Sequence, residues 1–226
     1  MGIETVGQRV TKKQRSNKTG QKQLLVGITG GIGAGKSAVA TVYREAGYPV
    51  FSADEIAREI VRPGSSALKE VRLLFGAQAI QMDGNLDRAF VRGKITADPS
   101  LRLKLEAITH PRIQKRSLEL AQAAFDDGAE IVFYEAPLLF EAKSDHAMDK
   151  VICVHAPDEA RIERTMKRDS SSKQSVEAFF AAQMSQEEKM KKCDFLVRNS
   201  GDLAELKLNA LEVLKELKAL PDNAES

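Results

Sequence analysis

The sequence predicts an α/β fold built on a parallel five-stranded sheet. Five short apolar runs, at residues 24–28, 48–51, 131–135, 151–154 and 195–197, are rich in β-branched and aromatic residues. Such continuous apolar runs are typical of parallel strands buried on both faces, and helix-compatible segments separate them. With 226 residues, 42% of them hydrophobic, the chain is long enough for one substantial core with inserted lobes.

The first apolar run leads into the sequence GGIGAGKS at residues 30–37, and a helix-compatible segment follows. A strand, a G-x-x-x-x-G-K-S/T loop and a helix together indicate a phosphate-binding P-loop. Glycines let backbone N–H groups converge on phosphate oxygens, and the helix N-terminus adds positive potential. Lys36 would reach the β- and γ-phosphates, and Ser37 would offer its hydroxyl to Mg²⁺. The expected nucleotide contacts are Gly31, Ile32, Gly33, Ala34, Gly35, Lys36, Ser37 and Ala38.

Two acidic residues are expected at the carboxyl edge of the sheet, where ligands bind in open α/β folds. Asp54 follows the second run at the start of a helix, so it is either a functional carboxylate or an ordinary capping or solvated residue. Glu135 ends the third run, as in the Walker-B pattern, in which the acid holds Mg²⁺ directly or through water.

Residues 157–193, between the fourth and fifth runs, are rich in cations. Arg161, Arg164 and Arg168 recur at intervals of three and four, which places them on one helical face. The alternative is that this positively charged helical face is simply exposed to solvent and has no role in binding. Phosphoryl transfer needs cations around the transferred group, however, and small kinases supply them from a mobile arginine-bearing lid. We therefore expect residues 157–193 to form a lid.

Residues 55–128 are mainly helical by pattern and too long for a simple crossover between parallel strands, so we expect an inserted lobe for a second substrate. Apolar spacing predicts helices near residues 71–75, 101–108 and 113–125. Pro111 is expected to separate the last two, because the residue before a proline is disfavoured in the α region. His110, at this break, is either a capping or packing residue or a catalyst.

Charge and targeting patterns narrow the function classes. Residues 1–23 carry six Lys or Arg and one Glu, a net charge of +5. Because the whole chain has a net charge of +2, the remaining residues carry −3. This segment is expected to be a disordered tail, and a nucleic-acid partner is disfavoured because the remainder lacks a basic footprint. The sequence contains no apolar segment long enough to predict a membrane-spanning helix. Two cysteines without a metal or disulfide spacing, Cys153 and Cys193, favour the cytoplasm.

The ordered motifs resemble the dephospho-CoA kinase family, P-loop kinases that add the 3′-phosphate in the last step of coenzyme A synthesis. The resemblance runs from residue 25 to residue 201. The matching segments are GITGGIGAGKS (27–37), ADEIAR (53–58), PG (63–64), FG (75–76), DGNLDR (83–88), HPRI (110–113), PLLFE (137–141), RTMKRD (164–169), Gln183, Asp194 and NSG (199–201).

The resemblance implies a three-layer α/β/α P-loop kinase fold, with a parallel five-stranded sheet, a helical substrate-binding insertion (55–128) and a mobile lid (157–193). The nucleotide-binding core is expected at 24–54, 129–156 and 194–220. The substrates would be ATP, with Mg²⁺, and dephospho-CoA, with neither nucleic acid nor membrane as partner. The chain would be a monomer or a weak homo-oligomer.

The resemblance also implies residue roles. Asp54 would face the ribose 3′-hydroxyl and act with Lys36 and Arg164 in catalysis, and Arg168 would join Arg164 as a lid cation at the nucleotide. The implied acceptor contacts are Thr29, Asp54, Arg58, Asp87, Arg88, His110, Pro137 and Leu138.

Two positions depart from the family pattern. Ser52 stands where the family commonly has the first Asp of Asp-Ala-Asp, and Phe179 and Phe180 stand where an arginine often precedes Gln183. Three alternatives stay open. One is a kinase of the nucleoside-monophosphate type. Another is a GTPase switch, which the absence of D-x-x-G and N-K-x-D motifs at the expected places disfavours. A third is a nucleic-acid-dependent ATPase.

Overall fold

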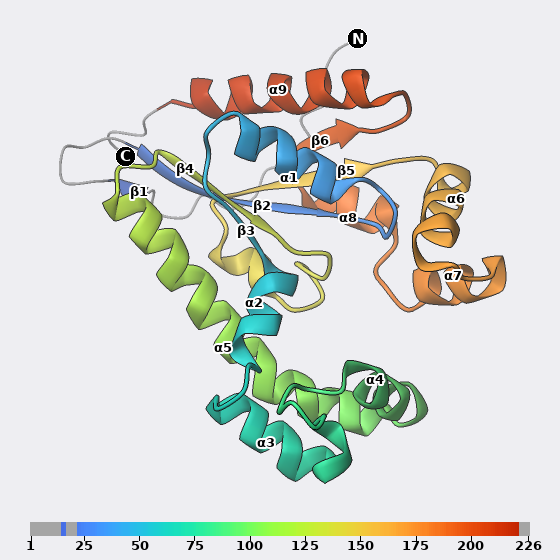
Figure 1. The fold of residues 1–226 in the computed structure, drawn as a ribbon. Coiled ribbons are helices and arrows are strands. Elements are labelled where there is room, and N and C mark those ends of the chain that lie inside the picture. The colour runs from blue at the N-terminus through green and yellow to red at the C-terminus, as the bar shows by residue number, and fades with distance from the viewer. Residues whose placement is uncertain (1–14, 17–21, 222–226) are drawn as a thin grey trace. The chain divides into compact units, whose positions relative to one another are not determined.

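A computed structural model describes residues 15–16 and 22–221 of the chain (Figure 1). Its elements are β1 (Arg15–Ser16), β2 (Lys22–Gly30), α1 (Lys36–Glu45), β3 (Val50–Ser52), α2 (Ala53–Ile60), α3 (Ser66–Phe75), η1 (Ala77–Ala79), α4 (Arg88–Ala97), α5 (Pro99–Asp126), β4 (Ile131–Glu135), η2 (Ser144–Ala147), β5 (Lys150–His155), α6 (Asp158–Asp169), α7 (Lys173–Ala181), α8 (Gln186–Lys192), β6 (Phe195–Arg198) and α9 (Leu203–Ala219).

The sheet confirms the predicted parallel five-stranded arrangement, with strand order β3-β4-β2-β5-β6. The central strand β2 pairs in parallel with β4 and β5, so that Ile28 lies opposite both Glu135 and Ile152. Because parallel strands end at the same edge, this register brings the carboxyl ends of β2, β4 and β5 together. The P-loop follows β2 at that edge.

The expected disordered tail, residues 1–23, lies largely outside the described residues. Within it, the structure describes β1, which pairs antiparallel with the start of β2 through Arg15 opposite Gln23 and Ser16 opposite Lys22. Residues 15–16 and 22–23 are therefore in strands, and the polar sequence of this segment did not indicate that they would pair.

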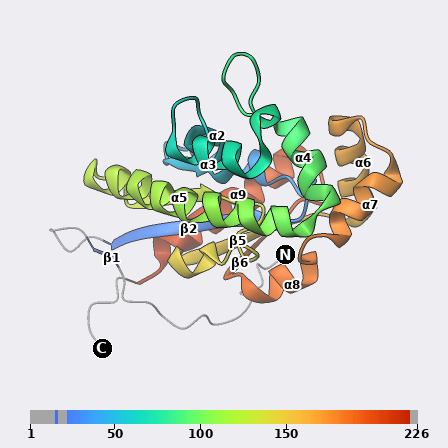
Figure 2. The same cartoon turned by 90° about the horizontal axis from the view of Figure 1, so that it is seen from below.

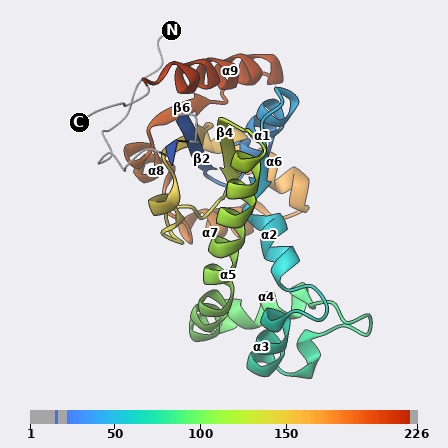
Figure 3. The ribbon, with the colours of Figure 1, turned by 90° about the vertical axis from the view of Figure 1, so that its left-hand side faces the viewer.

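Helices cover both faces of the sheet, as the predicted three-layer α/β/α fold requires. α1 and α9 pack together on one face and α8 lies on the other (Figures 1 and 3). Between α1 and the sheet, Tyr43 stacks on Phe133 with ring centroids 4.2 Å apart. The apolar residues that predicted the last helix are buried on α9. α6 and α7 lie beyond the end of the sheet opposite β1 (Figures 1 and 2).

The chain divides into two compact units, residues 52–120 and the remainder. The smaller unit is helical and has its own apolar cluster around Val61, Leu68 and Val71. Within it, Arg112 pairs with Glu70 and Arg116 pairs with Glu59, so α5 is tied to α3 and α2. Its bounds differ from the expected 55–128, because the end of α5 belongs to the larger unit. Among the described residues, no helix is long and apolar enough to cross a membrane.

The expected helix break at His110-Pro111 is wrong, because α5 is one helix of 28 residues with Pro111 in its interior. A proline inside a helix removes one backbone hydrogen bond and crowds the preceding turn. Side chains next to Pro111 bond the carbonyls of that turn: Thr109 Oγ1 donates to Leu105 O at 2.9 Å and Arg112 Nη1 to Ile108 O at 2.6 Å. Neither bond reaches the carbonyl of Ala107, which has lost its partner at Pro111, but Leu105 and Ile108 pack against the apolar cluster of this unit, and that packing offsets the local preference.

Candidate active site

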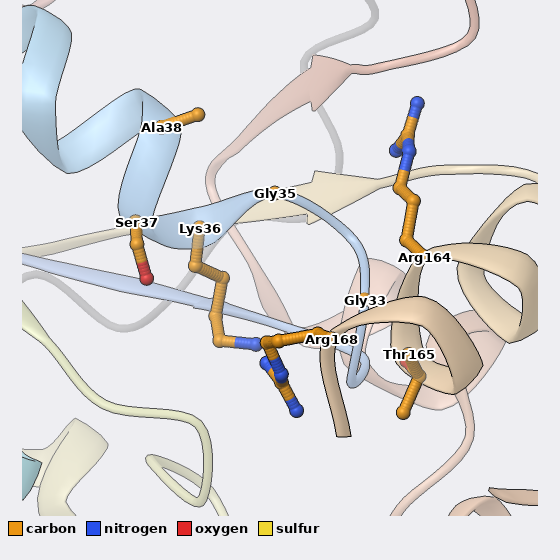
Figure 4. A pocket seen from close by; sticks show the side chains of 8 residues that line it. All are labelled: Gly33, Gly35, Lys36, Ser37, Ala38, Arg164, Thr165 and Arg168. Atoms are coloured by element: carbon orange, nitrogen blue, oxygen red, sulfur yellow. The ribbon is translucent and has the colours of Figure 1, made fainter. Parts of the chain in front are cut away.

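A pocket of about 260 Å³ opens where the P-loop meets α6 (Figure 4). Its lining residues are Gly33, Gly35, Lys36, Ser37, Ala38, Arg164, Thr165 and Arg168. The sequence singled out every one of these except Thr165. Thr165 lies four residues after Arg161, so its place on the same helical face was a signal for it. The expected nucleotide contacts Gly31, Ile32 and Ala34 lie in the loop but do not line this pocket.

The P-loop adopts a shape that only glycine tolerates at two pocket positions. Gly33 and Gly35 have φ values of +74° and +99°, in the left-handed region. A Cβ on Gly33 would lie 2.5 Å from the carbonyl oxygen of Arg161, and one on Gly35 would strike Asn199 Nδ2. Asn199 Nδ2 donates to Ala34 O at 2.8 Å. The loop is therefore fixed by close neighbours as well as by its own backbone preferences.

Lys36 is folded back onto the loop. Its side chain is 8% exposed, and Nζ donates to the carbonyl oxygens of Gly30 and Gly31 at 3.2 and 2.9 Å. Burial, followed by the neighbouring Lys189 ammonium, lowers the pKa of Lys36 to about 8, while Glu135 opposes the shift. The ammonium is still mainly protonated at neutral pH, and an anion in the pocket would stabilise that charged form.

Ser37 and Glu135 are brought together across α1 and β4, because Ser37 Oγ donates to Glu135 Oε1 at 2.7 Å. A hydroxyl and a carboxylate oxygen are the hard ligands that Mg²⁺ prefers. The described residues contain no cluster of three or more His, Cys, Asp or Glu suited to a metal ion. This pair fits Mg²⁺ held by one or two protein ligands plus substrate phosphates and water, and does not fit a metal enclosed by protein.

The three arginines of α6 have different surroundings. Arg168 makes two bonds to the carboxylate of Asp169, at 2.7 and 2.8 Å. The Nη1 atom of Arg164 is buried without a hydrogen-bond partner among the described residues. In Figure 4, the guanidinium group of Arg164 points away from Lys36. Arg161, which the expected nucleotide contacts omitted, is buried against the loop and donates from Nε to Ile32 O at 2.9 Å.

The segment after β4 is held by buried polar groups. Thr29 is fully buried and its hydroxyl donates to Pro137 O at 3.4 Å. The same carbonyl accepts from Lys189 Nζ at 2.7 Å, and that ammonium pairs with Glu141 Oε1 at 2.9 Å. Pro137 and Leu138 are half-buried. Lys189 is 0% exposed, and sequence analysis missed its role because it lies in a run of charged residues typical of surfaces.

Within the unit 52–120, three of the expected acceptor contacts lie near one another. Burial and the neighbouring Arg58 guanidinium lower the pKa of Arg88, and Asp54 opposes that shift. Asp54 is exposed in the first turn of α2, whose N-cap residue, Ser52, makes no side-chain cap bond. The carboxylate of Asp54 is therefore not the N-cap of this helix, which removes the capping alternative.

The other two expected contacts in this unit, Asp87 and His110, lie at a helix N-terminus and inside a helix. Asp87 caps α4, because its Oδ1 accepts from Phe90 N at 2.9 Å. His110 is half-buried inside α5, so it packs within a helix and does not cap one.

Comparison with known proteins identifies the family. The sequence model of the dephospho-CoA kinase family matches residues 24–205. The dephospho-CoA kinase of Syntrophotalea carbinolica is 40% identical over 198 residues, 86% of this chain and 92% of that protein. The enzyme of Chromobacterium violaceum is 41% identical over 185 residues, 81% of this chain and 89% of that protein.

The chain belongs to the dephospho-CoA kinase family. Solved structures agree with this. A Thermus thermophilus protein superposes with a TM-score of 0.75 at 35% identity, covering 86% of this chain and 98% of its own. The dephospho-CoA kinase of Campylobacter jejuni gives 0.67 at 28% identity, covering 86% and 97%. Family membership confirms the resemblance over the alternatives of a nucleoside-monophosphate-type kinase, a GTPase switch and a nucleic-acid-dependent ATPase.

Proposed function

We propose that this chain transfers the γ-phosphoryl group of ATP to the ribose 3′-hydroxyl of dephospho-CoA, giving coenzyme A and ADP. The family match over residues 24–205 carries this proposal. The P-loop pocket supports it, because loop glycines, Lys36 and two arginines of α6 line one pocket at the start of α1, and such a lining suits phosphates.

The nucleotide side of the reaction is electrostatic. Lys36 and Arg164 would offset charge on the transferred group, and the orphaned Nη1 of Arg164 is a donor available to an anion. Arg168 would join them by exchanging its Asp169 partner for phosphate. Ser37 and Glu135 would hold Mg²⁺, which when bound neutralises phosphate charge. Residues 157–193 are proposed to act as the lid that excludes water.

On the acceptor side, Asp54 is proposed to orient the 3′-hydroxyl and accept its proton. The transition state of phosphoryl transfer is loose, so positioning contributes more than nucleophile activation. Arg58 and Arg88, which lie near Asp54 in the same unit, are proposed to bind phosphates of dephospho-CoA. His110, Pro137 and Leu138 remain proposed contacts. Thr29 and Asp87 are proposed to position the acceptor site, Thr29 by holding the Pro137 carbonyl and Asp87 by capping α4.

A coupled assay of ADP release tests the proposal, with dephospho-CoA, AMP, CMP and shikimate offered side by side at equal concentration. We expect kcat/KM for dephospho-CoA to exceed that for every other acceptor by orders of magnitude, since remote acceptor contacts are used in the transition state. Equal efficiency with AMP or shikimate would contradict the assignment.

A further inference from the structure

The side chain of Arg161 is packed onto the P-loop. It is 6% exposed, and its Nε donates to Ile32 O at 2.9 Å. A Cβ added to Gly31 would collide with its guanidinium group. Glycine at this position thus makes room for the guanidinium, which lies close against the loop.

Two further groups, Asp158 and Phe180, hold that guanidinium in place, and Gln186 holds Asp158. Asp158 Oδ1 accepts from Nη1 at 2.6 Å, and the Phe180 ring lies 4.1 Å from the guanidinium carbon. Gln186 Nε2 donates to the same Asp158 oxygen and to Ala156 O, each at 3.0 Å. The side chain is therefore fixed from α6, α7 and α8 at once, which is unlike the exposed, Asp169-paired Arg168.

A fixed carbonyl fixes the next amide. In a trans peptide the C=O and the following N–H point in opposite directions in one plane. The bond from Arg161 to Ile32 O therefore directs the Gly33 N–H to the opposite side, and the bond from Asn199 to Ala34 O does the same for Gly35 N–H. Both glycines line the pocket.

We propose that Arg161 and Asn199 are positioning residues that hold the peptide planes of Ile32–Gly33 and Ala34–Gly35 in the phosphate-binding orientation. Arg161 is thereby distinguished from the lid cations Arg164 and Arg168. The proposal rests on the proposed function for its kinetic consequences, but its primary test needs no acceptor.

The test is ADP binding, measured by calorimetry on the full-length protein. Arg161→Gln and Asn199→Ala should each weaken ADP binding by roughly tenfold or more, the usual loss when a hydrogen bond of this kind is removed. Hydrogen exchange of the peptide spanning residues 30–38 should accelerate in both variants. Asn199 is neutral, so its effect cannot arise from lost charge.

Arg161→Lys separates positioning from charge. A lysine keeps the charge but lacks the planar fork that bonds a carbonyl and a carboxylate while stacking on a ring. We expect it to remain close to Arg161→Gln. Recovery of wild-type affinity by Arg161→Lys would overturn the positioning role in favour of charge alone. ADP affinity within twofold of wild type in Arg161→Gln would overturn it outright.

The controls guard against misfolding and loss of the proposed function. Arg102→Gln makes the same change at an exposed ion pair with Glu106 and should leave ADP binding unchanged. Asp158 is 66% exposed, so removing Arg161 leaves no buried unpaired acid.

If Arg161→Gln fails to fold, Asp158→Asn and Phe180→Leu should each weaken ADP binding to a smaller extent, and unchanged binding in both would overturn the proposal. In turnover, KM for ATP should rise while KM for dephospho-CoA does not. A wild-type enzyme inactive on dephospho-CoA would refute the proposed function but leave the ADP test valid.

Discussion

At the scale of single residues, the charge of Lys36 depends on its surroundings. Burial and Lys189 bring its pKa to about 8, within reach of ordinary experiments. A phosphate group next to Nζ stabilises the protonated form and so raises the pKa in the complex. Binding and protonation are consequently linked: nucleotide should bind the charged form of Lys36 more tightly than the neutral form.

Nucleotide affinity should therefore fall as the pH rises above 8. The free protein loses the Lys36 proton there while the complex keeps it, so affinity should decline by up to about tenfold for each pH unit until the raised pKa is reached. Calorimetry at pH 8 in two buffers of different ionisation enthalpy should detect uptake of a fraction of a proton on ADP binding. Lys36→Met should bind more weakly and without that uptake. A flat affinity between pH 7 and pH 9 would contradict the linkage.

Tyr43 offers a second prediction, on stability. Its side chain is fully buried against Phe133, and its hydroxyl has no hydrogen-bond partner among the described residues. Removing an unsatisfied buried hydroxyl recovers its desolvation cost. Tyr43→Phe should leave the free energy of unfolding unchanged or raise it by about 1 kcal/mol. Urea denaturation measures this. Tyr43→Leu, which also loses the stacked ring, should be destabilising, and a large loss in Tyr43→Phe would show that the hydroxyl has a partner.

At the scale of elements, the sequence was most informative where one local pattern decides the structure. The third apolar run, residues 131–135, has the same bounds as β4, and the glycines of the P-loop motif at 33 and 35 have the left-handed conformations that glycine allows. Contacts between distant segments were not visible: the roles of Arg161, Lys189 and Asn199 depend on which elements meet. The helix break expected at Pro111 is wrong for a related reason, since tertiary packing of the surrounding turns overcame its local preference.

Pro111 should therefore destabilise α5 without breaking it. Its ring removes a backbone bond that alanine would restore, and the intrinsic difference in a helix interior is about 3 kcal/mol. Because α5 has adapted to the proline, Pro111→Ala should recover only part of this, and the thermal midpoint should rise by a few degrees. Gln114→Ala, at an exposed position of the same helix, is the control and should change it little. A lower midpoint in Pro111→Ala would mean that packing requires the proline.

The contact between α1 and β4 gives a prediction about metal. Ser37 and Glu135 form the oxygen pair that we propose for Mg²⁺. Glu135→Gln keeps the size and can still bond Ser37, but it lacks the charge. The Mg²⁺ concentration for half-maximal activity should rise by about tenfold, while ADP binding without Mg²⁺ should change little. Lys150→Gln tests for non-specific charge effects, because Lys150 lies at the opposite, amino end of β5 and pairs with Asp194 at 3.4 Å. An unchanged Mg²⁺ requirement in Glu135→Gln would remove this acid from the metal site.

At the scale of the whole molecule, the division into two units separates the proposed nucleotide contacts from most, but not all, of the proposed acceptor contacts, because Thr29, Pro137 and Leu138 belong to the larger unit. The P-loop, Lys36 and the α6 arginines belong to the larger unit, and Asp54, Arg58 and Arg88 belong to the unit 52–120. Changes in one unit should therefore alter the binding of one substrate more than that of the other. Arg88→Gln, for example, should raise KM for dephospho-CoA and leave ADP affinity near wild type.

Asp54 provides the sharpest test of this division. Asp54→Asn preserves the shape of the side chain and its place in the first turn of α2, so the fold should be retained. The carboxylate is lost, and kcat should fall by about 10²- to 10⁴-fold if Asp54 receives the proton of the acceptor hydroxyl. ADP affinity should be unchanged, because the proposed nucleotide contacts lie in the other unit. Glu55→Gln makes the matched change at the neighbouring exposed acid of the same helical turn, and should leave kcat within twofold. A folded Asp54→Asn enzyme that phosphorylates dephospho-CoA at nearly the wild-type rate would exclude Asp54 from the mechanism. Ser52, two residues earlier, has no carboxylate that could act in its place.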